Sequence, residues 1–109
     1  MAWLVRGDEV LASVEVAATR RTRARGLLGR RAVAGAFVLR PCRQVHTLGM
    51  RFPVDVAFCD RRGTVLHRAT LRPGRCSRIV PRAAFAVEAE GGAFARWRLE
   101  VGDVLEIRG

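Results

Sequence analysis

Apolar and polar side chains alternate over several short stretches of this 109-residue chain, the pattern of half-buried β-strands. Residues 9–17 alternate in this way, and residues 2–6 form a matching apolar stretch. Gly7 and Asp8 stand between the two and suit a tight turn. The N-terminal part of the chain is therefore predicted to form a β-hairpin.

Further strands are predicted where short apolar runs are bounded by glycine or proline. They cover residues 36–39, 54–60, 64–71, 79–80, 85–88 and 104–107. The run 54–60 is the strongest and predicts a central strand, which forms a second hairpin with 64–71. Residues 45–53 have no clean period and predict a shaped loop, whereas 93–100 fit either a helical turn or a strand.

One short helix is predicted in the N-terminal half, at residues 19–29. Thr19 is a suitable N-cap and Gly29 a suitable residue after the last turn. Many short strands with one helix predict a single α+β domain over residues 1–109, dominated by β-structure. The expected architecture is a small closed or half-open β-barrel, antiparallel or mixed.

Composition narrows the possible classes of protein. No apolar run approaches the roughly 18 residues that cross a bilayer, and residues 1–9 lack the basic region and long apolar stretch of a secretory signal, so a cytoplasmic protein is expected. The three cysteines, Cys42, Cys59 and Cys76, are widely spaced without a C-x-x-C motif, which disfavours structural zinc. Cys59 is predicted to lie in the core, whereas Cys42 and Cys76 stand beside arginines, which lower a thiol pKa when close.

The net charge is +10, and every basic side chain except the two histidines is arginine. Between Glu15 and Asp55 there is no acidic residue, and this region is expected to attract anions. GC-rich coding, which replaces lysine by arginine, is the alternative explanation of the overall charge. The acid-free stretch holds Arg20, Arg21, Arg23, Arg25, Arg30, Arg31, Arg40, Arg43 and Arg51.

Three motifs resemble one family. They are RGLLGR at residues 25–30, PCRQVHTLGMRFPVDVAF at 41–58, and AVEAEGG at 86–92 followed by a Gly-Asp pair at 102–103. Together they resemble the bacterial and archaeal domain of unknown function 192. The resemblance implies a compact, mainly β domain without an established activity. This sequence resembles the variant with His-Thr-x-Gly-Met-Arg, where many relatives have Trp-Met-Lys-Asn-Thr, which implies a different ligand if this loop binds one.

The densest polar cluster surrounds the second motif. Asp55 lies between Val54 and Val56 and should face the opposite side of its strand. A buried carboxylate needs a partner, and Arg25 or Arg51 is the predicted one. Such a pair would either belong to a ligand-binding site or be a structural salt bridge that fixes the helix or loop to the sheet. The candidate ligand-binding residues are Arg25, His46, Thr47, Met50, Arg51 and Asp55.

The leading hypothesis is a non-enzymatic binding module for a small anionic ligand or a partner peptide. A hydrolase or transferase that uses Cys42 or His46 is the first alternative. A nucleic-acid-binding protein that uses the arginine-rich segment 19–31 is the second. No metal or cofactor is expected, because His46 and Asp55 fall short of three zinc ligands and no phosphate-binding glycine motif occurs. The glycines at 49, 91, 92 and 102 are predicted to occupy turns with positive φ.

Overall fold

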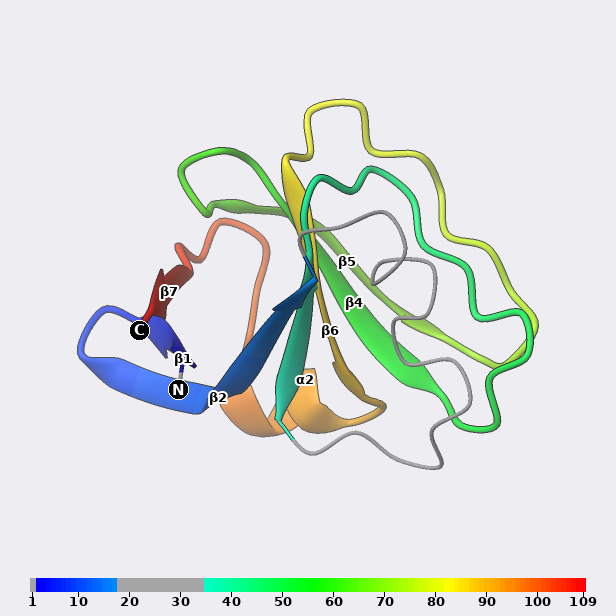
Figure 1. Ribbon diagram of the computed structural model, residues 1–109, viewed down its shortest axis with the longest axis horizontal. Coiled ribbons are helices and arrows are strands. Elements are labelled where there is room, and N and C mark those ends of the chain that lie inside the picture. Colours follow the sequence, from blue (N-terminus) through cyan, green and yellow to red (C-terminus); the bar gives the residue numbers. More distant parts are fainter. Residues whose placement is uncertain (1, 18–34) are drawn as a thin grey trace.

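A computed structural model describes residues 2–17 and 35–109 of the chain. In this part it contains seven strands and one short helix, drawn in Figure 1. The helix predicted at residues 19–29, together with Arg25, lies outside the described residues. The elements are β1 (Ala2–Arg6), β2 (Glu9–Ala17), β3 (Ala36–Leu39), β4 (Val54–Cys59), β5 (Val65–Leu71), β6 (Phe85–Glu90), α2 (Ala93–Trp97) and β7 (Glu106–Arg108).

All seven strands belong to one mixed sheet in the order β5-β4-β6-β3-β2-β1-β7. β2 and β3 are parallel, and the other neighbouring pairs are antiparallel. The predicted mainly β fold is therefore confirmed, and the sheet is half-open, because hydrogen bonds do not close it into a barrel. No helix in the described part of the chain is long and apolar enough to cross a membrane.

The C-terminal segment runs from one edge of the sheet to the other. Residues 103 and 105 hydrogen-bond next to the start of β5, and residues 106–108 pair with β1. Leu105 N donates to the Gly63 carbonyl over 2.9 Å, and Val65 N donates to the Asp103 carbonyl over 2.8 Å, at the start of β5. The next residues form β7, which pairs with β1 at the other edge. Gly63 is required here, because a Cβ would lie 2.0 Å from the Leu105 carbonyl oxygen and the residue has φ +90°.

The two faces of the sheet pack against different layers, because side chains alternate along each strand. On one face Ala57, Val87 and Ala89 pack with Phe94 of α2. On the other face two long connections cover the apolar side chains. That second cluster includes Phe37, Leu39, Val45, Val54, Val56, Phe58, Val80 and Ala83.

Most predicted strands are confirmed, including both hairpins. The strand predicted at residues 79–80 is wrong, because Val80 N donates to the Arg43 carbonyl in an irregular loop and Pro81 follows. The closing strand begins later than predicted, at Glu106. The ambiguous segment after Gly92 is helical over Ala93–Trp97.

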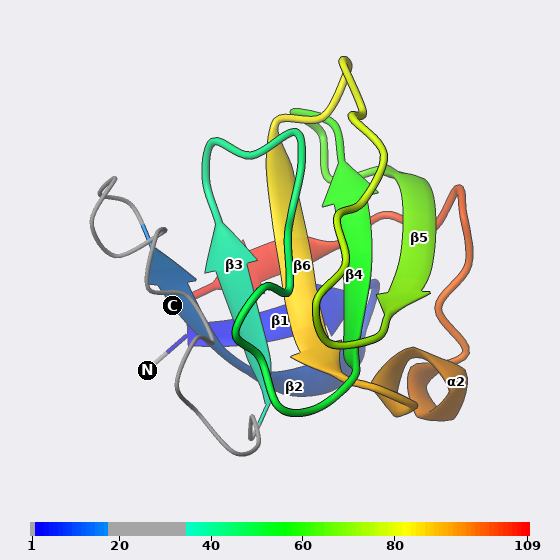
Figure 2. The ribbon, with the colours of Figure 1, turned by 90° about the vertical axis from the view of Figure 1, so that its right-hand side faces the viewer.

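The strand order makes two connections cross one face of the sheet. The chain must pass over β6 to go from β3 to β4, and over β4 to go from β5 to β6. These connections are residues 40–53 and 72–84, which together we call the double loop. Figure 2 shows them running side by side in front of β4 and β6.

Candidate functional site

Backbone hydrogen bonds join the two segments of the double loop into an irregular two-stranded ribbon. Thr47 N donates to Arg75 O over 2.7 Å, Ser77 N to Val45 O over 2.8 Å, and Val80 N to Arg43 O over 2.8 Å. Inward-facing side chains such as Val45 and Val80 are buried, whereas the intervening ones face solvent. The ribbon is therefore fixed on the sheet and presents a defined outer surface.

Thr47 holds the two segments together. Its side chain is 1% exposed, and its hydroxyl donates to the Arg72 carbonyl over 2.6 Å and accepts from Arg75 N over 2.9 Å. Its carbonyl accepts from both Gly74 N and Met50 N. Met50 is partly buried against the apolar cluster under the loop. Thr47 thus shapes the candidate site from inside the loop.

His46 is exposed on the outer surface of the double loop and lies in register with Cys76 across the ribbon. Cys42, the thiol that the enzyme hypothesis uses, donates its S–H to the Gln44 carbonyl over 3.2 Å. His46 and Cys42 therefore both belong to the first segment of the double loop, and Cys76 lies opposite His46 on the second.

Seven arginines project from the double loop into solvent, and neither segment contains an aspartate or glutamate. Within residues 2–17 and 35–109, none of these guanidinium groups forms an ion pair. Arg40 lies over the Phe85 ring, 4.8 Å from its centroid. The unneutralised charge makes this surface strongly attractive to anions. The seven are Arg40, Arg43, Arg51, Arg72, Arg75, Arg78 and Arg82.

Asp55 is buried on the opposite face of the sheet, as its position between two core valines predicts. One carboxylate oxygen accepts from the Thr70 hydroxyl over 2.6 Å, and the other accepts from Gly92 N and Phe94 N, each over 3.0 Å. The prediction that Arg51 pairs with Asp55 is therefore wrong. Asp55 instead satisfies free N–H groups at the start of α2, whose N-cap residue is a glycine without a side-chain cap.

Since His46 lies on the loop-covered side and Asp55 under α2, the two side chains do not line one pocket. A hollow of about 270 Å³ lies near Asp55, lined by Arg68, Ala69, Thr70 and Phe94. Among the described residues no group of three or more His, Cys, Asp or Glu side chains is arranged to hold a metal ion.

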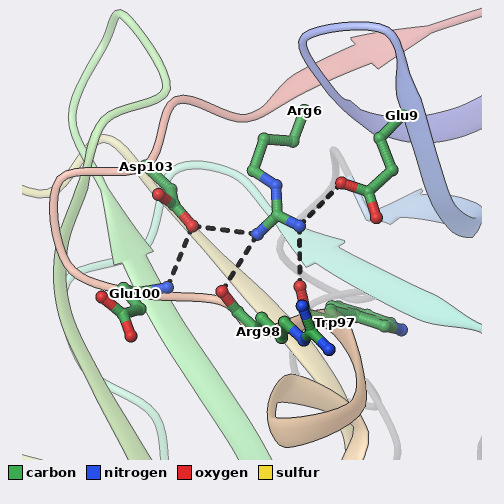
Figure 3. Close-up of polar contacts among 6 residues, drawn as sticks. All are labelled: Arg6, Glu9, Trp97, Arg98, Glu100 and Asp103. Carbon is green, nitrogen blue, oxygen red and sulfur yellow. Dashed lines mark hydrogen bonds and ion pairs between the residues drawn. The ribbon is translucent and has the colours of Figure 1, made fainter.

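A polar cluster around Arg6 ties the first hairpin to the end of α2 (Figure 3). The guanidinium donates to Glu9 over 2.8 Å, to Asp103 over 3.0 Å, and to the Trp97 carbonyl over 2.7 Å. The hydrogen bond to Glu9, followed by that to Asp103, raises the pKa of Arg6 despite the opposing effect of burial. Because these partners occupy the guanidinium, the cluster is architectural.

Glu88 is a buried acid that the sequence analysis did not single out. It is 5% exposed on β6, in register with Phe37 on one side and Val56 on the other. Within the described ranges no hydrogen bond or ion pair reaches its carboxyl group, and burial raises its pKa to about 7. The signal that could have found it is the one that marked Asp55, an acid inside an apolar strand.

The glycines of the second and third motifs serve the backbone. Gly49, Gly92 and Gly102 have positive φ, as predicted. Gly91 is the exception: it is required because a Cβ would lie 2.9 Å from Pro53 Cβ. The third motif therefore brings the end of β6 close to the start of β4.

A family model covers almost the whole fold just described. The model of DUF192, described as an uncharacterised family, matches residues 3–107. The chain belongs to the DUF192 family. No curated protein matches it. The match spans the fold and all three motifs of this DUF192 protein, except for its first two and last two residues.

Two solved structures share the fold of this DUF192 protein. One is a protein of unknown function from Novosphingobium aromaticivorans, with a TM-score of 0.80 and 20% identity over 96% of this chain and 82% of that one. The other is a candidate transcription regulator from Sinorhizobium meliloti, with a TM-score of 0.78 and 23% identity over 96% and 90% of the two chains. At these identities the likeness concerns the fold alone.

Proposed function

We propose that this DUF192 protein is a non-enzymatic binding module that holds an anionic ligand on the double loop. The observation that carries the proposal is the set of seven solvent-facing arginines on two paired segments without a single acid. A small anionic ligand or an acidic partner peptide would supply the missing negative charge. His46 and Arg51, on the same segment, are proposed to contribute to this surface. Arg25, outside the described residues, is proposed as a further ligand contact.

Clustered like charges destabilise the folded state by mutual repulsion, and a bound anion relieves it. Arginine also presents five N–H donors in a planar fork that matches carboxylate and phosphate groups. Binding at this surface should therefore stabilise the fold in proportion to RT ln(1 + [L]/Kd), about 2.7 kcal/mol at 100 times Kd.

The test is thermal unfolding in the presence of phosphate, citrate or an oligoglutamate peptide. We expect stabilisation of the wild type and its loss in the double variant Arg43→Ala/Arg78→Ala. The double variant Arg61→Ala/Arg62→Ala, which removes the same charge from the turn between β4 and β5, is the matched control and should keep the effect. Absence of stabilisation by all three anions, or equal loss in both variants, would overturn the proposal.

A further inference from the structure

We infer that the anionic ligand of the double loop is the phosphate backbone of duplex DNA. The inference rests on the proposed function, because it uses the same arginines, and it goes further by naming the partner. Three features of the double loop carry it: the extent of its charged surface, the kind of side chains it presents, and its two-stranded shape.

The arginines are spread along the ribbon rather than gathered around one point. The paired stretch from Cys42 to Thr47 covers six residues, which corresponds to about 20 Å of extended chain. Charged residues occur at both ends and on both segments, from Arg43 opposite Val80 to Arg72 near Thr47. A small anion can reach only one or two of these groups. Duplex DNA presents about one phosphate charge per 1.7 Å, or roughly 12 over the same length.

The side chains favour a double strand over a single strand. Proteins that bind single strands combine a basic groove with aromatic side chains on which the bases stack. The double loop contains one phenylalanine, Phe52, and no tyrosine or tryptophan, and Phe52 packs partly buried against the apolar cluster beneath the loop. The surface therefore offers seven guanidinium forks for phosphates but no row of exposed aromatic rings on which successive bases would stack.

The shape is also compatible with a duplex. The major groove of B-DNA, about 12 Å wide, admits a two-stranded β-ribbon. The double loop is an irregular two-stranded ribbon with a single β-bridge between His46 and Cys76, and hydrogen bonds from Cys42 N to Ala84 O and from Gly74 N to Thr47 O hold its two ends. Arginines that flank the ribbon would then face the phosphates on the two walls of the groove.

An acidic peptide is the alternative partner of the double loop. Two exposed apolar side chains distinguish peptide binding from DNA binding. Leu48 and Ile79 are 53% and 59% exposed on the double loop and would serve a peptide as apolar contacts. Contacts to a phosphate backbone are polar and do not need them. The double variant Leu48→Ser/Ile79→Ser should therefore weaken peptide binding and leave DNA binding within twofold of wild type.

The experiment is fluorescence anisotropy with a labelled 20-bp DNA duplex over a range of salt concentrations. Each arginine that contacts a phosphate adds about 0.9 to the slope of log K against log salt. The triple variant Arg43→Ala/Arg75→Ala/Arg78→Ala should bind at least tenfold more weakly and reduce the slope by about 2 to 3. The triple variant Arg61→Ala/Arg62→Ala/Arg68→Ala removes the same charge elsewhere and should leave the slope nearly unchanged.

Three outcomes would overturn the inference. They are no salt-dependent binding of the duplex, equal losses in the two triple variants, and equally tight binding of the single strand. Stabilisation by phosphate or citrate without duplex binding would remove this inference and leave the proposed function intact. Should the loop triple variant fail to fold in a thermal melt, the single variant Arg78→Ala, with an expected slope change of about 0.9, replaces it.

Discussion

Replacing Glu88 by glutamine tests whether the buried carboxyl group on β6 makes stability depend on pH. Burial raises the pKa of Glu88 from 4.5 to about 7, and no hydrogen bond or ion pair from the described residues offsets the cost of ionising it. In the folded protein the group therefore holds its proton more tightly than in the unfolded chain. The favourable contribution is fully present below pH 4.5 and is lost as the pH rises through 7.

The shift from 4.5 to about 7 sets the size of the effect. At about 1.4 kcal/mol per pKa unit, the wild type should lose about 3.5 kcal/mol of folding free energy between the two limits from this group alone. Glutamine cannot ionise, so the free energy of unfolding of Glu88→Gln should rise relative to that of the wild type by about this amount between pH 4.5 and pH 8. For a domain of this size, 1 kcal/mol corresponds to a Tm change of about 4 °C.

Urea unfolding of both proteins at several pH values measures the difference directly. Glu90→Gln is the matched control, because Glu90 lies on the same strand but is partly exposed and paired with Arg96. Its stability relative to wild type should vary little over the same range. A constant difference between the wild type and Glu88→Gln from pH 4.5 to pH 8 would refute the argument that burial controls this carboxyl group.

Three further predictions follow from contacts in the structure. Asp55→Ala, which leaves the N–H groups of α2 without their acceptor, should cost about 3 kcal/mol in chemical unfolding, and a cost below 1 kcal/mol would contradict the proposed cap. Thr47→Val should cost about 2 kcal/mol and weaken anion binding, because it disconnects the two segments of the double loop; unchanged melting would contradict this. Alkylation followed by mass spectrometry should modify exposed Cys76 first, Cys42 later, and Cys59 only on unfolding, since burial raises the pKa of Cys59 to about 12. Fastest reaction at Cys42 would instead favour the hypothesis of an enzyme that uses this thiol.

Local patterns were enough to predict most of the sheet. The alternation in residues 9–17 and the apolar run before Asp60 are properties of single strands, and both hairpins turn where glycine permits it. The failure at Ile79 and Val80 has a long-range cause. Val80 N finds its acceptor on Arg43, 37 positions earlier, so the segment pairs within a loop instead of joining the sheet.

The candidate site was harder to predict because it is formed by two connections, residues 40–53 and 72–84, that each cross over a strand of the sheet. The position of Asp55 among core valines correctly indicated burial and the need for a partner. Its actual partners are backbone groups of Gly92 and Phe94, which carry no chemical signature in a sequence. The acid-free stretch before Asp55 was visible, but only the strand order places residues 72–84 beside residues 40–53.

The position of β7 determines whether this protein is protected against self-association through its sheet edge. β7 is only three residues long, yet it covers the outer edge of β1, the strand that begins the fold. Loss of residues 106–108 would leave a row of backbone groups on β1 open to pairing with another molecule. Such molecules would associate with one another through the exposed edge of β1, while the rest of the sheet and the double loop stayed folded.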